Sequence, residues 1–192
     1  MKNSVREAAD ILRGGGVVVF PTETVYGIGV AAGDAAALER LRTLKNRPAP
    51  NPFQLLSADM DMAKRIGAVF SAQAARLGRS FWPGPLTLVV PDGTGSGGTL
   101  GIRVPDSPFV LALCRELERP IISSSANVAG APPPTGAAAA DVFGDGVDLL
   151  VDGGPATEGV PSSVVRCLDD SFEILRCGGV DADALQAAWD GE

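Results

Sequence analysis

The sequence predicts an α/β fold of the α+β kind, in which helices flank a mixed sheet of parallel and antiparallel strands. Helical and strand patterns alternate early in the chain, whereas its end is rich in strands, and no internal repeat is visible. A chain of 192 residues fits one domain, because a division into two would leave both parts small. We therefore expect residues 1–192 to form a single domain.

Helices are expected where apolar residues recur on one face, often after a capping residue. Asp34 is such a cap, and Leu38, Leu41 and Leu44 follow it at intervals of three residues. This helix should end near Lys45, because the prolines that follow cannot continue it. The expected helices cover residues 4–13, 34–45, 59–69, 71–80, 107–117, a short stretch ending at 143, and 183–189.

Strands are expected where short apolar runs are bounded by glycine, proline or polar residues. The unbroken run Val17–Phe20, which ends at Pro21, is typical of a strand buried on both faces. Glycine- and proline-rich loops separate the later runs. The expected strands cover residues 17–20, 53–56, 86–91, 100–104, 120–123, 147–151, 163–168 and 172–176.

The composition excludes several classes of function. A net charge of −7 argues against broad, unspecific nucleic-acid binding, although it leaves room for a local basic pocket. The absence of histidine removes Ser–His and Cys–His catalysis and the usual zinc ligands. Cys114, Cys167 and Cys177 are widely spaced, which is typical of reduced thiols rather than of disulfides or a zinc site. With no signal-peptide pattern and no apolar run near the roughly 20 residues of a membrane span, we expect a cytoplasmic protein without a metal site.

The first polar segment that can carry chemistry is Pro21–Gly27. Its hydroxyls at Thr22, Thr24 and Tyr26 alternate, so they share one face if the segment stays extended, and such a row can bind a polar ligand. An ordinary strand exit with a turn at Gly27 explains the same residues.

The second polar segment begins at Lys45 and Arg47 and continues to Asn51 and Pro52. Two cations held by prolines in a loop can grip phosphate, Arg47 with a planar fork and Lys45 as a point charge. The alternative is a solvated helix end, where basic side chains favour the helix dipole.

The third polar segment is Ser123–Asn127, which follows a buried strand. Ligands of open α/β sheets bind beyond the carboxyl ends of strands, and small hydroxyl residues there let a phosphate or carboxylate approach. A turn that satisfies its own backbone is the alternative. Arg103 and Arg176 each end an apolar strand, and Ser162–Ser163 follow a glycine-rich loop, so these side chains can also face a pocket.

Taken in order, seven short segments of the chain resemble the YrdC-like family of threonylcarbamoyl-AMP synthases. The resemblance implies a single domain with a twisted mixed sheet and a large, concave, positively charged cavity. Long family members add a linker and a second domain, so the chain resembles the short form. The matching segments are PTETVYGIG (21–29), KNRPAPNP (45–52), FWPGPLTLVV (81–90), GIRVPDSP (101–108), SSSANVAGAPPPT (123–135), DGGPATEGVPSSVV (152–165) and ILRCGG (174–179).

The resemblance also implies roles for individual residues. It assigns ATP contacts and the stabilisation of the reacting phosphate to one group, and threonine contacts to another. Long members of the family carry His where this chain has Leu56, and many members carry His where it has Ser107. GVPSS at 159–163 replaces the family's G-V-E-S-T. These differences affect threonine recognition more than ATP binding. The ATP group is Lys45, Arg47, Asn51, Arg103, Ser125 and Arg176, with Lys45 and Arg47 catalytic, and the threonine group is Thr24, Ser107, Ser123, Ser162 and Ser163.

The implied activity is that of a nucleotidyltransferase which converts L-threonine, bicarbonate and ATP to threonylcarbamoyl-AMP and pyrophosphate. The carboxylate of N-carboxythreonine would attack the α-phosphate, with Mg²⁺ on the phosphates and Lys45, Arg47 and Arg103 stabilising the charge. No general base is needed, which suits a chain without histidine. The product would be handed to a tRNA threonylcarbamoyl-transferase that modifies adenosine 37, with weak tRNA contact and no membrane partner.

Three other interpretations stay open from the sequence. The same fold can serve as a double-stranded RNA or tRNA-binding module, although the charge of −7 weighs against it. The same fold can also serve a different carbamoyl or acyl adenylation, since a related domain uses carbamoyl phosphate, but the absence of zinc-finger cysteines and accessory domains argues against it. The Gly- and Pro-rich loops can also be turns alone, which leaves the clustered basic and hydroxyl residues to coincidence.

Overall fold

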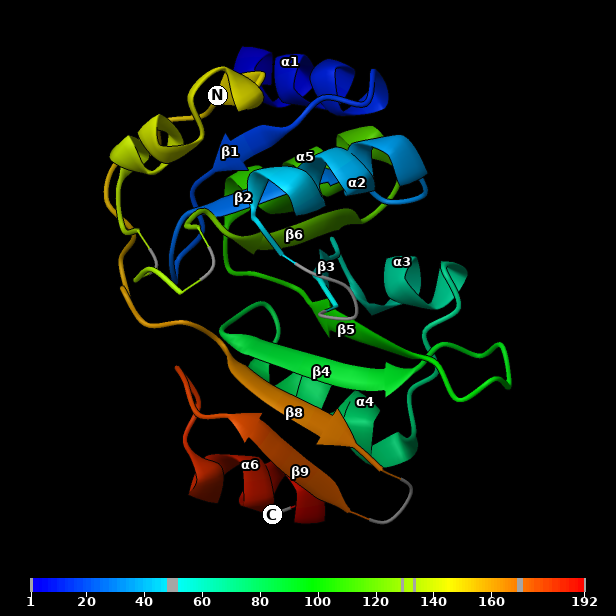
Figure 1. Ribbon diagram of the computed structural model, residues 1–192. Helices are drawn as coiled ribbons and strands as arrows, with labels where there is room; N and C mark the ends of the chain where they lie inside the picture. The colour runs from blue at the N-terminus through cyan, green and yellow to red at the C-terminus, as the bar shows by residue number, and fades with distance from the viewer. Residues whose placement is uncertain (1, 48–51, 129, 133, 169–170, 192) are drawn as a thin grey trace.

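The computed structural model describes residues 2–47, 52–128, 130–132, 134–168 and 171–191 (Figure 1). The described residues form one sheet of nine strands in the order β7-β1-β2-β6-β3-β5-β4-β8-β9. The strands are β1 (Val18–Phe20), β2 (Gly27–Ala31), β3 (Gln54–Leu56), β4 (Leu86–Pro91), β5 (Thr99–Arg103), β6 (Ile121–Ser125), β7 (Leu149–Leu150), β8 (Ser163–Cys167) and β9 (Phe172–Arg176). The helices are α1 (Lys2–Arg13), α2 (Ala35–Leu44), α3 (Met60–Arg65), α4 (Ala72–Phe81), α5 (Pro108–Leu117), the 3₁₀ segment η1 (Ala137–Gly146) and α6 (Ala182–Asp190).

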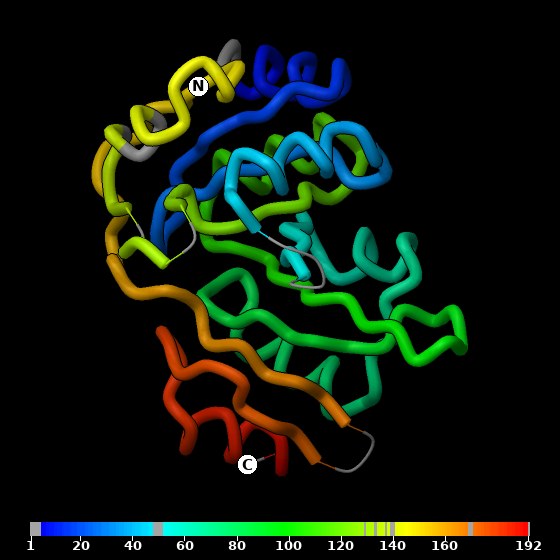
Figure 2. Tube along the Cα trace, in the orientation of Figure 1, coloured from blue at the N-terminus to red at the C-terminus, as the bar shows by residue number. Residues whose placement is uncertain are grey.

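The sheet is mixed, as the sequence predicts. Strand β1 is parallel to β7, β3 to β5, and β4 to β8, while the other neighbouring pairs are antiparallel. The chain passes from β7 at one edge of the sheet to β8 near the other edge through residues 151–162. Figure 2 shows this connection running down one side of the molecule between its upper and lower halves.

One face of the sheet is covered by α2 towards one end and by α4 and α6 towards the other. Ile28 and Val30 of β2 pack with Ala37 and Leu41 of α2. On the same face, Leu86, Leu88, Val90 and Ile102 of β4 and β5 pack against α4 and α6, with Ile122 of β6 next to both clusters. These buried side chains form the larger part of the core, because alternate residues of every strand point to this face.

The opposite face is covered over only part of its width. Val18, Phe20 and Ile121 pack against α1 and α5. Over β5, β4 and β8 this face carries no helix among the described residues, and Figure 1 shows α4 behind β4 and β8, and α6 behind β9. The uncovered part is where the cavity described below lies.

Most predicted elements are confirmed, and the local capping signals explain why. Asp34 accepts the N–H of Ala37 at 2.9 Å at the start of α2. Ser107 caps α5, and Pro108 stands in its first turn, where a missing N–H costs nothing. Strand β9 has the bounds that the sequence predicts. Helix α1 begins two residues earlier than predicted, and α4 and α6 differ from prediction by one residue at each end.

Strand β2 is the main element that sequence analysis misses. Gly27 and Gly29 weaken its strand pattern, but they are needed because Phe20 lies across them. A Cβ atom at Gly27 would come within 2.7 Å of the Phe20 ring. Pairing with β2 also keeps Ser123–Ser125 in strand β6, so the expectation that a turn begins at Ser123 is wrong.

Three further predictions need correction. The helix expected over 59–69 ends at Arg65, because Gly67 takes a φ of 98° that no helix allows. The strand expected over 147–151 is reduced to Leu149–Leu150, since only these residues pair with β1. The helix expected before 143 is a 3₁₀ segment with a break at Gly144. No helix of the described residues has the length and apolar character to cross a membrane.

Candidate active site

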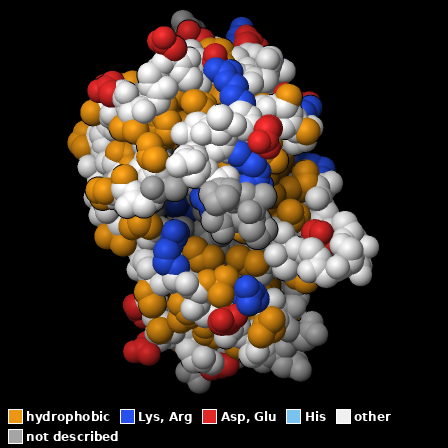
Figure 3. All heavy atoms as spheres, viewed as in Figure 1, with side chains coloured by type: hydrophobic (Ala, Val, Ile, Leu, Met, Phe, Trp, Pro, Cys, Tyr) orange, Lys and Arg blue, Asp and Glu red, His pale blue; other side chains and the backbone are white. Residues whose placement is uncertain are grey.

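A cavity of about 300 Å³ opens on the uncovered face of the sheet. Strand register explains its floor, because paired residues on neighbouring strands point to the same face. Ser123 pairs with Gln54, Gln54 with Gly101, and Gly101 with Val89, and Thr87 pairs with Val164. All of these residues line the cavity, so five strands (β6, β3, β5, β4 and β8) supply one continuous floor. Figure 3 shows the hollow in the middle of this face, with Lys and Arg side chains near it.

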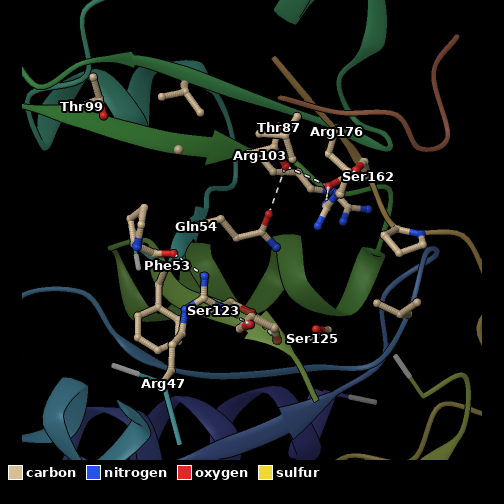
Figure 4. Close-up of a pocket in the computed structure, with 17 residues that line it drawn as sticks. Arg47, Phe53, Gln54, Thr87, Thr99, Arg103, Ser123, Ser125, Ser162 and Arg176 are labelled. Carbon is tan, nitrogen blue, oxygen red and sulfur yellow. Dashed lines mark hydrogen bonds between the residues drawn. The ribbon is translucent and has the colours of Figure 1, made fainter. Parts of the chain in front are cut away.

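Three arginines line the cavity, and no acidic side chain is among its described lining residues. Arg47 follows α2, Arg103 ends β5, and Arg176 ends β9. Figure 4 shows Arg103 and Arg176 together at one end of the cavity, with Arg47 at the other. Guanidinium groups only donate hydrogen bonds, so the cavity suits a ligand with several anionic oxygens.

Arg103 is held rigidly from behind. Its side chain is 3% exposed and donates to the Gly84 carbonyl at 3.1 Å, to Thr24 Oγ1 at 2.9 Å, and to Glu23 Oε1 at 2.5 Å. The same Glu23 oxygen accepts the backbone N–H of Asp106 at 3.1 Å. Three of the five N–H groups of a guanidinium are thus used, which leaves two to meet a ligand.

Arg176 and Arg47 are anchored through backbone carbonyls. Arg176 donates from Nε and Nη2 to the Ser162 carbonyl at 2.9 and 2.8 Å. Arg47 donates to the Pro52 carbonyl at 2.7 Å and lies over the Phe53 ring, 4.9 Å from its centroid. Burial lowers the pKa of both arginines, helped by Arg103 beside Arg176 and by Arg42 beside Arg47. Because these cations repel one another and the described lining residues include no acid, an anion bound there is favoured.

Lys45 lies outside the lining of the cavity. Its side chain is 2% exposed, and Nζ donates to the carbonyls of Ser125 and Asn127. Burial, with Arg47 as the second cause, lowers the pKa of Lys45 to about 8. The lysine therefore ties the end of α2 to the end of β6, which places Ser125 at the cavity.

The structure brings together six of the predicted site residues, and others lie behind them. Thr24 accepts from Arg103, Ser107 caps α5, and Ser163 donates to the Val180 carbonyl at 2.6 Å. These three and Lys45 do not line the cavity, and Asn51 lies outside the described residues. The predicted residues that line it are Arg47, Arg103, Ser123, Ser125, Ser162 and Arg176.

The predicted row of hydroxyls in Pro21–Gly27 does not form. The segment bends between Glu23 and Val25, so the condition that it stays extended is not met. Thr22 and Thr24 contact each other at 3.0 Å between hydroxyl oxygens, while the Tyr26 hydroxyl donates to the Gly154 carbonyl at 2.7 Å. Tyr26 thereby fastens the connection that leads to β8.

Sequence analysis misses three residues of this site. Glu23 holds Arg103, and Gln54 and Thr87 lie on the floor, hydrogen-bonded to each other at 3.0 Å. The sequence signal that could have found such residues is a single polar residue within an apolar run, such as Thr87 within Leu86–Val90. A buried polar residue needs a partner, so such a position indicates either a site or an internal hydrogen bond.

Comparisons with known proteins find one matching family model and several similar proteins. The family model Sua5_yciO_yrdC, described as "Telomere recombination", matches residues 10–178. The threonylcarbamoyl-AMP synthase of Bacillus subtilis is 40% identical over 193 residues, which cover 95% of this chain and 56% of that protein. The enzyme of the same name from Chromohalobacter salexigens is 40% identical over 171 residues, covering 83% of this chain and 90% of the relative.

Solved structures show the same fold. A crystal structure of Pyrococcus abyssi Sua5 complexed with L-threonine superposes with a TM-score of 0.90 at 36% identity, covering 98% of this chain and 58% of that one. Escherichia coli YciO superposes with a TM-score of 0.85 at 26% identity, covering 96% of this chain and 94% of that one. The chain spans little more than half the length of the Bacillus and Pyrococcus relatives it matches.

Proposed function

The chain belongs to the Sua5/YciO/YrdC family, and from that premise we propose that it is an L-threonylcarbamoyladenylate synthase. It converts L-threonine, bicarbonate and ATP to threonylcarbamoyl-AMP and pyrophosphate. The observation that carries the proposal is the cavity itself. Three guanidinium groups surround a floor of hydroxyl, amide and small side chains, and the described lining contains no acid. Such a cavity suits a polyphosphate next to a small amino acid.

The chemical step needs no proton transfer by the protein. The threonine amine bonds to the carbon of bicarbonate, whose hydroxyl leaves as water with one proton of the amine, and the product is an N-carboxylate. One carboxylate oxygen then attacks the α-phosphorus of ATP. The bond from that phosphorus to the bridging oxygen breaks, and the electron pair leaves with pyrophosphate. Arg47, Arg103 and Arg176 stabilise the negative charge on the phosphoryl oxygens. Holding the two reactants in line lowers the barrier further, by up to about 7–11 kcal/mol.

The proposed contacts divide into direct and supporting groups. Arg47, Arg103, Arg176 and Ser125 contact ATP, together with Asn51, while Ser123 and Ser162 contact the amino acid. Thr24, Ser107 and Ser163 act at the threonine end by positioning, since each is engaged with the protein behind the cavity. Lys45 supports catalysis by holding Ser125.

Mg²⁺ enters with ATP as part of the substrate. Among the described residues, no group of three or more Asp, Glu, Cys or His side chains is arranged to hold a metal ion. The phosphates would supply the metal's ligands, and the ion would neutralise charge on the departing pyrophosphate. The protein residues that meet this complex are the arginines.

Two wider assignments belong to the same proposal. Residues 1–192 form one domain, which the single sheet of all described strands supports. The protein acts in the cytoplasm and hands its product to a tRNA threonylcarbamoyl-transferase, with at most weak tRNA contact. Free thiols at Cys114, Cys167 and Cys177 support a reducing compartment.

The test is pyrophosphate release from ATP with bicarbonate, measured with threonine, with serine and with no amino acid. The proposal expects the highest rate with threonine and only background without an amino acid. Equal rates in the three reactions would contradict it. A salt-sensitive affinity for RNA without threonine-dependent turnover would instead favour the RNA-binding alternative.

A further inference from the structure

A chain of hydrogen bonds crosses the floor of the cavity from β9 to β3. Arg176 Nη2 donates to Ser162 Oγ at 3.0 Å, Ser162 Oγ lies 3.0 Å from Thr87 Oγ1, and Thr87 Oγ1 donates to Gln54 Oε1 at 3.0 Å. Figure 4 shows the labelled side chains in this order, with Gln54 between Arg47 on one side and Arg103 and Arg176 on the other. No role assigned above uses Gln54.

The direction of this chain follows from the bonds at its two ends. A guanidinium can only donate, so Ser162 Oγ accepts from Arg176. Thr87 has one hydroxyl proton and gives it to Gln54, so the contact between Thr87 and Ser162 must be donated by Ser162. Each hydroxyl then accepts one hydrogen bond and donates one, and the chain ends on the carbonyl oxygen of Gln54.

This direction decides which atom Gln54 offers to a ligand. Because Oε1 accepts from Thr87, the carboxamide nitrogen is the free end of the side chain, and it has no hydrogen-bond partner among the described residues. Figure 4 shows this nitrogen turned away from Thr87, toward the open space between the arginines. The hydrogen-bond chain thus holds two N–H donors at the centre of the cavity.

A second observation points to the kind of ligand atom that these donors meet. The arginines at both ends of the cavity offer only donors, and the described lining residues include no carboxylate. A ligand that fits must therefore present acceptor oxygens along its length. A neutral amide between the cations adds a directional contact without adding a fourth positive charge.

We propose that Gln54 is a substrate-recognition residue whose carboxamide nitrogen donates to an anionic oxygen of the bound substrate. Two sources carry that chemistry in the proposed function, on which this inference rests: the phosphates of ATP and the carboxylate of the amino acid. Thr87 is the positioning residue that fixes the orientation of the amide. The competing explanation is that Gln54 only satisfies the Thr87 hydroxyl.

The test measures binding of ATP, inorganic pyrophosphate and L-threonine by calorimetry to wild type, Gln54→Met and Gln54→Glu. Met has a similar length and lacks donors, and Glu keeps an oxygen for Thr87 while replacing the donor with an acceptor. Losing a hydrogen bond to a charged oxygen should weaken binding about tenfold or more. Both variants should lose affinity for the same ligand. A loss for ATP and pyrophosphate assigns the contact to phosphate, whereas a loss for threonine alone assigns it to the carboxylate.

Controls separate recognition from folding and from charge. Gln73→Glu makes the same chemical change on α4, which packs on the opposite face of the sheet, and should bind all three ligands as wild type does. Thr87→Val should weaken the same ligand as Gln54→Met, while Thr87→Ser should restore binding. Thermal unfolding of each variant shows that it is folded.

The outcomes distinguish the inference from the function on which it rests. If Gln54→Met binds all three ligands like wild type, the inference is overturned, even if Gln54→Glu is weak, because charge alone then explains the second variant. If the folded wild type binds neither ATP nor threonine, the proposed function and the inference fall together. Binding by wild type with a selective loss in Gln54→Met supports both.

Discussion

Removing the carboxylate of Glu23 tests whether the cavity depends on a buried ion pair. Glu23 and Arg103 have side chains that are 7% and 3% exposed, with 2.5 Å between Oε1 and Nη2. Replacing Glu23 with Ala leaves the Arg103 guanidinium buried without its counter-charge, and it also removes the acceptor of the Asp106 N–H. Thr24 and Gly84 still accept from Arg103, but neither carries a negative charge.

The magnitude follows from the cost of an uncompensated buried charge. Breaking a buried pair by removing one partner destabilises a protein by about 3–5 kcal/mol. Glu23→Gln keeps the shape and an acceptor oxygen and loses only the charge, so the smaller loss of about 1.5–3 kcal/mol for a charged hydrogen bond applies. For a chain of this size each kcal/mol lowers Tm by about 2–4 °C.

Urea unfolding monitored by circular dichroism measures these free energies, and a double-mutant cycle with Arg103→Met isolates the pair. The double variant should be less destabilised than the sum of the two single variants, because neither charge is left alone. Pyrophosphate release should fall in Glu23→Gln even where the protein is folded, because Arg103 is no longer held in place. A Glu23→Ala protein within about 1 kcal/mol of wild type would refute the reasoning.

Three other predictions follow from the same geometry. Arg47→Ala and Arg176→Ala should each lower the rate of pyrophosphate release about 100-fold or more, because each removes a cation that stabilises the transition state. The circular dichroism spectra should be unchanged. Near-normal rates in both variants would remove these residues from the mechanism. Lys45 has a pKa of about 8 in the folded protein against 10.5 for the free side chain. The unfolded chain keeps that proton to higher pH, so the contribution of Lys45 to the free energy of unfolding should rise between pH 8 and 10.5, by up to roughly 3 kcal/mol. Lys45→Met should lose this rise. Parallel curves of stability against pH for the two proteins would count against the low pKa. Ser163→Ala should cost about 1–3 kcal/mol in urea unfolding, since it leaves the Val180 carbonyl and N–H without their partner, and a variant of wild-type stability would contradict the role of that contact.

The parts of the fold that sequence predicts are those set by neighbouring residues. Asp34, Asp59, Ser71 and Ser107 each cap a helix that begins at the next residue, and each bonds an N–H three positions on. Buried strands such as β4 are equally plain from their apolar runs. Strand β2 is not recognisable from its own residues, because its glycines are required by the Phe20 ring on the neighbouring strand.

The site is harder to predict, because its contacts join residues that are far apart along the chain. Thr87 meets Gln54 across 33 positions, and Arg103 meets Glu23 across 80. Strand order and register create these pairs, and neither can be read from a single short motif. Arg103 and Arg176 could be singled out because a charge at the end of an apolar strand is unusual. The difference between lining the cavity and supporting it, as at Ser162 and Ser163, depends on which face of the sheet each side chain takes.

The most direct test of the central claim is the incorporation of isotopically labelled bicarbonate into a nucleotide product. The purified chain is incubated with ATP, Mg²⁺ and labelled bicarbonate, with and without L-threonine, and the products are separated and identified by mass spectrometry. The account predicts a labelled adduct with the mass of threonylcarbamoyl-AMP, formed only when threonine and ATP are both present. Pyrophosphate release without any labelled adduct, or an adduct that forms without threonine, would contradict it.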